Sequence, residues 1–299
     1  MSASRDPRPA VGLIGLGNMG TAFAERLLEA GHHLHLHNRS SAKAEPLARR
    51  GAQVAATPAE LAAAVDVVVT SLPDDDAFET VAAAVIGAAR PGTVLVDTST
   101  VSPDVSARVA SLAEGASVEY LRAPVSGNPS VVRAGRLAFI VSGPPAAREH
   151  ADPVLRAIGE TVHVVGDAEQ ARVVKLAINL VIAGLAQLMA EALVLGETSG
   201  VSREALLETM GASAAGAPFV KYKTEPLLRD DYSATFTTTL MEKDVDLVLE
   251  TARAGGVELP LANEIKALVA GAIDAGYGDD DFMALYLNLR SALDRRVVR

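Results

Sequence analysis

The sequence predicts an α/β protein with a mostly parallel sheet in its N-terminal domain, a long interdomain helix and an all-helical C-terminal domain. Short apolar runs alternate with helical patterns up to about residue 166, which is typical of strands and helices that build a parallel sheet. From residue 167 onward there is no convincing strand pattern, and residues 167–198 predict one long helix. We therefore expect two domains, residues 1–166 and residues 167–299.

The composition narrows the classes of protein and partner. The 299 residues are 49% hydrophobic, which is enough to form the cores of two domains. A net charge of −10 argues against nucleic acid or an anionic membrane as a partner. The chain contains no cysteine, which excludes disulfides, thiolate metal sites and cysteine nucleophiles. Its first residues are polar and lack the apolar segment of a signal peptide, so we expect a cytoplasmic protein.

The first predicted strand, residues 11–14, runs directly into a glycine-rich turn and a helical stretch. This context turns a G-x-G-x-x-G pattern into the dinucleotide-binding fingerprint of a Rossmann domain. Gly15 permits a tight turn, Gly17 lets the backbone approach a pyrophosphate, and Gly20 lets the helix pack against the strand. The helix N-terminus then offers unpaired N–H groups to the phosphates. The residues expected to bind the cofactor here are Gly15, Leu16, Gly17, Asn18, Met19 and Gly20.

The end of the second predicted strand indicates which dinucleotide binds. NAD enzymes place an Asp or Glu at this point to bind the ribose 2′-hydroxyl, but here the chain reads Asn38-Arg39-Ser40. An arginine pairs well with a 2′-phosphate, whereas a carboxylate would repel it. Ser40 or Ser41 also suits the N-cap of a helix, and both roles can hold together. The pattern favours NADP(H) over NAD(H).

Strand and helix patterns continue to alternate through the first half. Thr57 is predicted as the N-cap of a helix that begins at Pro58. Helices are also predicted to start at the acidic residues 74–76 and at Ser102. The carboxylates around Asp74 fit a helix start better than a metal cluster. His33, His35 and His37 share one strand face without a carboxylate among them, so we predict no metal site. Further strands are predicted at residues 52–54, 66–72, 93–100, 118–125, 137–142 and 162–165.

The long helix, residues 169–198, is apolar over most of its middle. From Val173 to Met189 only Lys175, Asn179 and Gln187 interrupt the apolar residues, so we expect a helix buried on every side rather than a membrane span. Further helices are predicted at residues 202–210, 232–254, 260–275 and 279–293, with a loop at 211–218.

Lys175 is the most informative residue of the second half. Most lysines are solvated surface groups, but apolar neighbours leave this one little room for a solvated face. A buried ammonium needs a partner or a use, and burial lowers the pKa of a lysine towards the range useful for proton transfer. Asn179 lies four residues later, on the same side of the helix. The pair predicts proton delivery to a carbonyl oxygen while a hydride reaches the carbonyl carbon.

The sequence Ser126-Gly127-Asn128 follows a predicted strand and is small and prone to turn. Consecutive backbone N–H groups in such a turn can bind an anion such as a carboxylate. Most sequences of this kind are simple turns, however, and that interpretation stays open.

Four motifs together resemble the β-hydroxyacid dehydrogenase family, which includes 3-hydroxyisobutyrate dehydrogenase and tartronate semialdehyde reductase. They occur in the family's order and spacing across almost the whole chain. The motifs are Gly15-Leu-Gly-Asn-Met-Gly20, Ala123-Pro-Val-Ser-Gly127, Lys175-x-x-x-Asn179, and Lys243-Asp244 with Leu247. The resemblance implies a Rossmann domain, a long interdomain helix, and a helical domain that contributes to a homodimer.

The resemblance also implies an activity and a set of roles. It implies an oxidoreductase that interconverts a small 3-hydroxy acid and its semialdehyde or keto acid by hydride transfer. Lys175 would be the general acid/base, Asn179 would support it, and Ser126, Gly127 and Asn128 would bind the substrate carboxylate. Leu72 and Thr100 fall at cofactor contacts of the family, and Lys243 falls near the nicotinamide end.

Three departures from the family pattern bear on the identity of the substrate. Arg122 replaces the usual Asp before Ala-Pro-Val-Ser-Gly, Asn128 replaces the second glycine of the turn, and Ile178-Asn179 replaces a frequent Asn-Asn.

Two alternative functions remain. Related imine reductases and reductive aminases share the architecture but usually lack the lysine, so Lys175 favours a carbonyl or alcohol substrate. A non-catalytic NADPH-binding module is the other alternative.

Overall fold

The structure, a computed structural model, describes residues 8–297 of the chain. It forms two compact units, the first up to Lys175 and the second from Leu176 onward. Helix α8 (Gln170–Thr198) begins in the first unit and continues into the second. The expected domain boundary between residues 166 and 167 stays a prediction.

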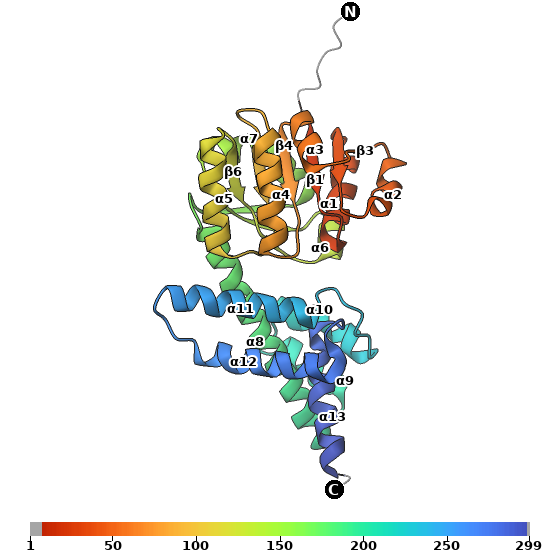
Figure 1. Cartoon of the computed structure of the whole chain (residues 1–299). Helices are drawn as coiled ribbons and strands as arrows, with labels where there is room; N and C mark the ends of the chain where they lie inside the picture. The colour runs from red at the N-terminus through yellow and green to blue at the C-terminus, as the bar shows by residue number, and fades with distance from the viewer. Residues whose placement is uncertain (1–7, 298–299) are drawn as a thin grey trace, which may run out of the picture. The chain divides into compact units, whose positions relative to one another are not determined.

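The first unit contains one sheet, which has nine strands in the described residues, in the order β3-β2-β1-β4-β5-β6-β8-β7 with β9 paired to β8 (Figure 1). The first six strands are parallel and follow the 3-2-1-4-5-6 order of a Rossmann sheet, which confirms the predicted fold class. The strands are β1 (Val11–Ile14), β2 (Leu34–His37), β3 (Gln53–Val54), β4 (Val67–Thr70), β5 (Val94–Asp97), β6 (Glu119–Arg122), β7 (Val125–Ser126), β8 (Ala138–Ser142) and β9 (Thr161–Gly166).

One strand prediction is wrong in detail. Residues 118–125 form two strands, β6 and β7, because β7 pairs in the antiparallel direction with β8 rather than continuing along β5. Pro124 lies at the break, where its missing N–H removes no bond from a ladder.

Helices cover both faces of this sheet, because alternate residues of a strand point to opposite sides. Val67 and Val69 pack in the cluster that includes α1 and α7, whereas Val68 packs in the cluster of α3, α4 and α5. Figure 1 shows α4 and α5 together on one side of the strands. The helices are α1 (Asn18–Glu29), α2 (Glu45–Ala48), α3 (Pro58–Ala64), α4 (Asp75–Ala88), α5 (Pro103–Gly115), α6 (Pro129–Arg133) and α7 (Pro145–Ile158).

The predicted N-cap Thr57 is confirmed, and Asp74 and Ser102, which were expected at helix starts, are N-caps as well. Thr57 accepts a hydrogen bond from the N–H of Glu60, Asp74 from that of Ala77, and Ser102 from that of Val105. Each side chain satisfies a donor that the first helical turn leaves without a backbone partner.

The second unit is all-helical in the described residues, as predicted, but it contains one helix that was not predicted, and two others begin later than expected. A helix at 218–228 was not predicted, and it begins at a proline that suits the first helical position. The helix expected from residue 232 begins after Thr237, which caps it by accepting from the N–H of Leu240. The last helix begins at residue 285 rather than 279. The helices are α9 (Arg203–Ala212), α10 (Pro218–Leu228), α11 (Thr238–Ala254), α12 (Pro260–Ala272) and α13 (Leu285–Val297).

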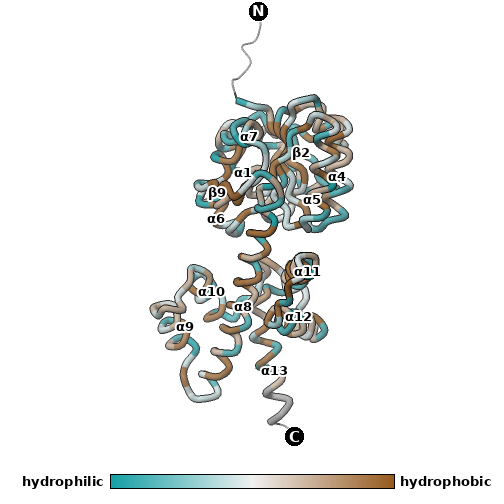
Figure 2. Tube along the Cα trace, turned by 90° about the vertical axis from the view of Figure 1, so that its left-hand side faces the viewer, coloured by the Kyte–Doolittle hydropathy of each residue, from teal (hydrophilic) through white to brown (hydrophobic). Residues whose placement is uncertain are grey.

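The expectation that α8 is buried on every side is wrong. Ala183, Ala186 and Leu193 are fully buried in the core of the second unit, but Val181 and Leu188 are 62% and 61% exposed. Figure 2 shows hydrophobic residues along much of the helix. By length and composition alone α8 is apolar enough to cross a membrane, and it is the one such helix among residues 8–297. Its buried side makes it the core helix of the second unit.

A buried ion pair fixes α10 in the second unit. Lys223 Nζ lies 2.6 Å and 2.7 Å from the two carboxylate oxygens of Asp281, and both side chains are almost fully buried. Asp281 also accepts from Thr235 Oγ1 and from the N–H of Met283. Burial lowers the pKa of Lys223, although Asp281 opposes that shift. The pair is therefore sensitive to the loss of either partner.

We predict that Lys223→Met lowers the free energy of unfolding of the chain by about 3–5 kcal/mol, because it leaves the Asp281 carboxylate buried without its counter-ion. Denaturant unfolding followed by circular dichroism measures the change. The control is Arg229→Met, which removes an exposed pair with Glu225 and should cost less than about 1 kcal/mol. Equal, small losses in both variants would contradict the prediction.

Candidate functional site

The glycine turn between β1 and α1 has the backbone that a pyrophosphate requires. A Cβ on Gly20 would lie 1.9 Å from the carbonyl oxygen of Gly15, so only glycine lets α1 pack this closely. A Cβ on Gly17 would meet no heavy atom within 4 Å, so the space in front of this backbone is open. Gly17 is the N-cap residue, and no side chain caps the first turn of α1. The N–H groups there fit a phosphate group.

Asn38 fastens the glycine turn to the end of β2. Its Oδ1 accepts from the N–H of Leu16 at 2.9 Å, and its Nδ2 donates to the carbonyl oxygen of Ser40 at 2.9 Å. Arg39 and Ser40 are exposed beside it. Ser40 is the N-cap residue of a short 3₁₀ helix but makes no side-chain cap bond. Asn38 thus shapes the turn, and the contact of these residues with a 2′-phosphate stays a prediction.

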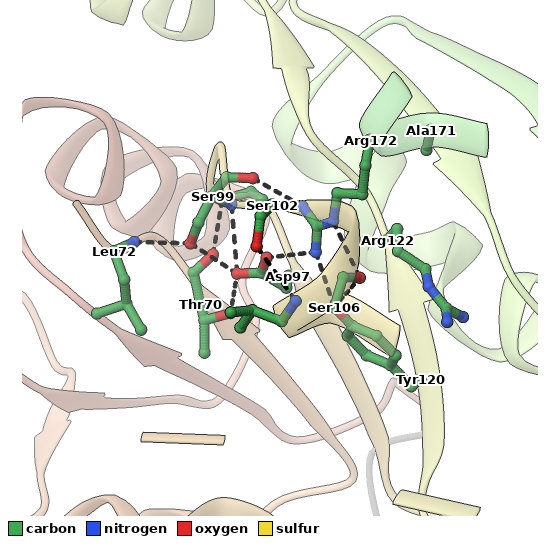
Figure 3. A network of polar contacts seen from close by, with 12 residues as sticks. Thr70, Leu72, Asp97, Ser99, Ser102, Ser106, Tyr120, Arg122, Ala171 and Arg172 are labelled. Carbon is green, nitrogen blue, oxygen red and sulfur yellow. Dashed lines mark hydrogen bonds and ion pairs between the residues drawn. The ribbon is translucent and has the colours of Figure 1, made fainter. Parts of the chain in front are cut away.

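The carboxylate of Asp97, at the end of β5, holds the loops that follow β4 and β5 (Figure 3). Its Oδ1 accepts from Thr70 Oγ1 and from Ser99 Oγ, both at 2.6 Å. Ser99 Oγ in turn accepts from the N–H of Leu72 at 2.9 Å. Leu72 and Thr100, the two cofactor contacts that the family resemblance implies, are therefore in or next to a hydrogen-bonded pair of loops. Their contact with a cofactor stays a prediction.

Arg172 in the first turn of α8 completes this network. Its Nη2 donates to Asp97 Oδ2 at 2.5 Å and to the Tyr120 hydroxyl at 2.7 Å, and its Nη1 donates to the Ser99 carbonyl oxygen at 2.7 Å. Its Nε donates to Ser106 Oγ at 3.2 Å. Arg172 is 1% exposed and Asp97 is fully buried. Burial raises the pKa of Tyr120 to about 12, so its hydroxyl keeps its proton.

Sequence analysis missed this network. The apolar part of the helix starts at Val173, so the charge of Arg172 lies just outside it. The available signal was an arginine three residues before the lysine on an apolar helix, together with an aspartate at a strand end. Both residue types need a partner when they are buried.

Arg122, the first departure from the family pattern, pairs with Glu169. Its Nε donates to Glu169 Oε1 at 2.9 Å, and its guanidinium carbon lies 4.4 Å from the centre of the Tyr120 ring. Figure 3 shows its side chain directed away from Asp97. The arginine is therefore matched by an acid immediately before α8.

The Ser126-Gly127-Asn128 turn connects β7 to α6. Gly127 has a φ of +143°, and a Cβ there would lie 2.9 Å from Leu137 Cδ1, so the turn requires glycine. The Asn128 side chain caps α6, since its Oδ1 accepts from the N–H groups of Ser130 and Val131 at 3.0 Å and 3.1 Å. Asn128 thus builds the turn, and carboxylate binding by these three residues stays a prediction.

Lys175 and Asn179 lie one turn apart in α8. Lys175 is half-buried rather than fully buried, and Asn179 is 6% exposed. In the second unit, Asn179 Nδ2 donates to Asp244 Oδ2, and Lys243 Nζ lies 2.9 Å from Asp244 Oδ1. Asp244 is 1% exposed. It joins two residues that were predicted as functional, although sequence analysis gave it no role of its own.

The histidines of β2 do not gather metal ligands. Within residues 8–297, no group of three or more His, Asp or Glu side chains could hold a metal ion. His37 Nδ1 lies instead 3.1 Å from the carbonyl oxygen of Ala55.

Comparison with known proteins identifies the family. Residues 10–166 match the model of the NAD-binding domain of 6-phosphogluconate dehydrogenase, and residues 170–289 match the NAD-binding model of NADP-dependent 3-hydroxyisobutyrate dehydrogenase. A 2-(hydroxymethyl)glutarate dehydrogenase of Eubacterium barkeri is 34% identical over 279 residues, which cover 92% of this chain and 93% of the relative.

Solved structures agree with this result. The 3-hydroxyisobutyrate dehydrogenase of Mycobacterium tuberculosis, with L-serine, superposes with a TM-score of 0.86 at 31% identity, over 95% of this chain and 99% of that one. A reductive aminase of Aspergillus terreus, with NADPH4, cyclohexanone and allyl amine, gives a TM-score of 0.57 at 27% identity, over 93% of this chain and 98% of that one. The chain is an NAD(P)-dependent hydroxyacid oxidoreductase and belongs to the β-hydroxyacid dehydrogenase family.

Proposed function

We propose that the protein is an NADP(H)-preferring oxidoreductase that interconverts a small 3-hydroxy acid and its semialdehyde or keto acid. The observation that carries this proposal is Lys175, a half-buried lysine one helical turn from Asn179, in a chain whose relatives are hydroxyacid dehydrogenases. The nicotinamide supplies the hydride in the direction of reduction. Lys175 Nζ gives its proton to the carbonyl oxygen as the carbonyl carbon accepts the hydride, and it takes that proton back in oxidation.

The other residues bind and orient. The Ser126 hydroxyl and the backbone N–H groups of Gly127 and Asn128 hold the substrate carboxylate, supported by the glycine-dependent shape of that turn. Asn179 supports Lys175 and is itself held by its hydrogen bond to Asp244. Lys243 pairs with the same Asp244 carboxylate. We assign it to the nicotinamide end of the cofactor.

The preference for NADP(H) rests on the end of β2. Asn38 is used to hold the glycine turn, which leaves Arg39 as the exposed cation for the 2′-phosphate, with Ser40 beside it. The backbone at Gly17, where a Cβ would meet no heavy atom within 4 Å, would hold the pyrophosphate. Leu72 and Thr100, on the loops after β4 and β5, contact the nicotinamide half.

Two observations favour this function over an imine reductase or reductive aminase. The structural match to 3-hydroxyisobutyrate dehydrogenase, with a TM-score of 0.86, is closer than the match to the reductive aminase, with 0.57. Lys175 also provides the acid that a carbonyl oxygen requires.

We also propose that the protein works as a cytoplasmic homodimer. The absence of cysteine agrees with a reducing compartment. Val181, Leu188 and Leu195 recur every seven residues along one side of α8 and are 62%, 61% and 70% exposed. Val181 and Leu188 line an apolar groove of about 420 Å³ between α8 and α12. An exposed apolar surface of this kind is typical of an interface, and a second copy of the chain can cover it.

We predict that Lys175→Ala lowers turnover by about 10²-fold or more, because the proton donor is lost. Fluorescence titration should show that NADPH still binds. The matched control is Lys266→Ala, which removes an exposed lysine of α12 that pairs with Asp246. Near-normal turnover in Lys175→Ala would overturn the assignment.

We predict that Arg39→Ala weakens the affinity for NADP(H) by about 10- to 100-fold, because a charged hydrogen-bond partner of the 2′-phosphate is lost. The affinity for NAD(H), which has no such phosphate, should change little. Isothermal titration with both cofactors measures the ratio, with Arg156→Ala, an exposed arginine of α7, as the control. Equal losses for NADP(H) and NAD(H) would contradict the role of Arg39.

We predict that Leu188→Glu converts a wild-type dimer into a monomer, since it places a charge in the middle of the apolar surface of α8. Analytical ultracentrifugation at micromolar concentration measures the mass. Leu112→Glu, at an exposed leucine of α5, should leave the dimer intact. A monomeric wild-type chain, or a Leu188→Glu variant that stays dimeric, would refute this interface.

A further inference from the structure

The start of α8 is fastened to the sheet at two points that lie one turn apart. Arg172 binds Asp97 at the end of β5, and Glu169, just before the helix, binds Arg122 at the end of β6. Residues three apart share a side of a helix, so the two ion pairs grip the same side of the first turn. Tyr120 links them, because its hydroxyl accepts from Arg172 and its ring lies under Arg122.

The stability of the fold alone does not require these ion pairs. A buried ion pair pays a desolvation cost, and an apolar pair of similar volume is often as stable. The four contacts of the Arg172 guanidinium reach four different parts of the first unit: strand β5, the loop after it, helix α5 and strand β6. They fix the rotation of the helix as well as its position, since a planar guanidinium satisfies all of them in one orientation only.

The network lies between the proposed proton donor and the loops expected at the cofactor. Lys175 follows Arg172 by three residues, so any rotation or shift of the first turn moves both. On its other side, Asp97 holds Ser99, and Ser99 holds the backbone of Leu72. One carboxylate therefore ties the lysine-bearing turn to the two loops.

We propose that Arg172 and Asp97 are positioning residues for hydride transfer, which set the place of Lys175 relative to the strand-end loops at Leu72 and Thr100. This inference rests on the proposed function of Lys175. Neither residue touches the substrate. Their effect is on turnover rather than on binding, because the proton and hydride transfers depend on distance more steeply than cofactor affinity does. A misplacement of about 1 Å can cost about 10²-fold in rate.

The test compares Arg172→Gln and Tyr120→Phe with the wild-type chain. Tyr120→Phe removes one hydroxyl from the network and keeps the ring that Arg122 covers. The control is Arg108→Gln, which breaks an exposed two-bond pair with Glu79 in the same unit. The assay follows reduction of NADP⁺ with 3-hydroxyisobutyrate, and with L-serine as a second probe.

We expect kcat to fall by about 10²-fold in Arg172→Gln and by about 3- to 10-fold in Tyr120→Phe. KM for the probe and the dissociation constant of NADPH should change by less than about threefold in both, and Arg108→Gln should match the wild type. Independently of activity, amide hydrogen exchange over residues 170–175 should speed up by about tenfold or more in Arg172→Gln but not in Arg108→Gln.

Wild-type kcat in folded Arg172→Gln and Tyr120→Phe would overturn the proposal, and so would a loss of NADPH affinity as large as the loss of kcat. If Arg172→Gln does not fold, Tyr120→Phe decides by the same criteria. Lys175→Ala in the same assay separates the proposed function from the proposed positioning role of Arg172 and Asp97. Full turnover in that variant, or no turnover of any small 3-hydroxy acid by the wild type, refutes the proposed function. An inactive Lys175→Ala beside fully active network variants refutes only the positioning role.

Discussion

The ion pair between Arg172 and Asp97 is the interaction on which the arrangement of the strand-end loops and of the first turn of α8 depends. Both side chains are removed from water, so each charge relies on the other and on the hydroxyls around them. One carboxylate oxygen of Asp97 accepts hydrogen bonds from Thr70 and Ser99, and the other accepts one from Arg172. The loops after β4 and β5 and the first turn of α8 are therefore one hydrogen-bonded assembly.

Helix α8 shows how one element meets three demands along its length. Its first turns carry Arg172, Lys175 and Asn179, whose charges and amides need polar partners. Further along, one side packs small residues such as Ala183 and Ala186 into the core of the second unit, and another side leaves Leu188 exposed. The sequence therefore predicts the apolar composition of α8 correctly, but it does not predict that one side of the helix is exposed. A surface that a second chain covers has the same composition as a core.

The sequence alone predicted the features that depend on neighbours along the chain. The glycine turn, the caps at Thr57, Asp74 and Ser102, and the alternation of strands and helices are local, so their residue types were enough. The family could be predicted because four motifs occur in the family's order and spacing along the chain. The partners of Arg172 could not be predicted, because Asp97 and Tyr120 lie more than fifty residues away and meet it only in the folded sheet. Arg122 with Glu169 and Asn179 with Asp244 are likewise distant in the chain, 47 and 65 residues apart, and meet only in the folded protein.

The central claim is that this chain oxidises a small 3-hydroxy acid with NADP⁺. The most direct measurement is a panel of small 3-hydroxy acids, with cyclic imines as the competing class. Each is tested with the NADP and NAD couples while the absorbance of the reduced nicotinamide is followed. The account predicts reversible turnover of a 3-hydroxy acid, faster with NADP⁺ than with NAD⁺, and no reduction of the imines. Reduction of imines without turnover of any hydroxy acid, or tight NADPH binding without any turnover, would contradict it.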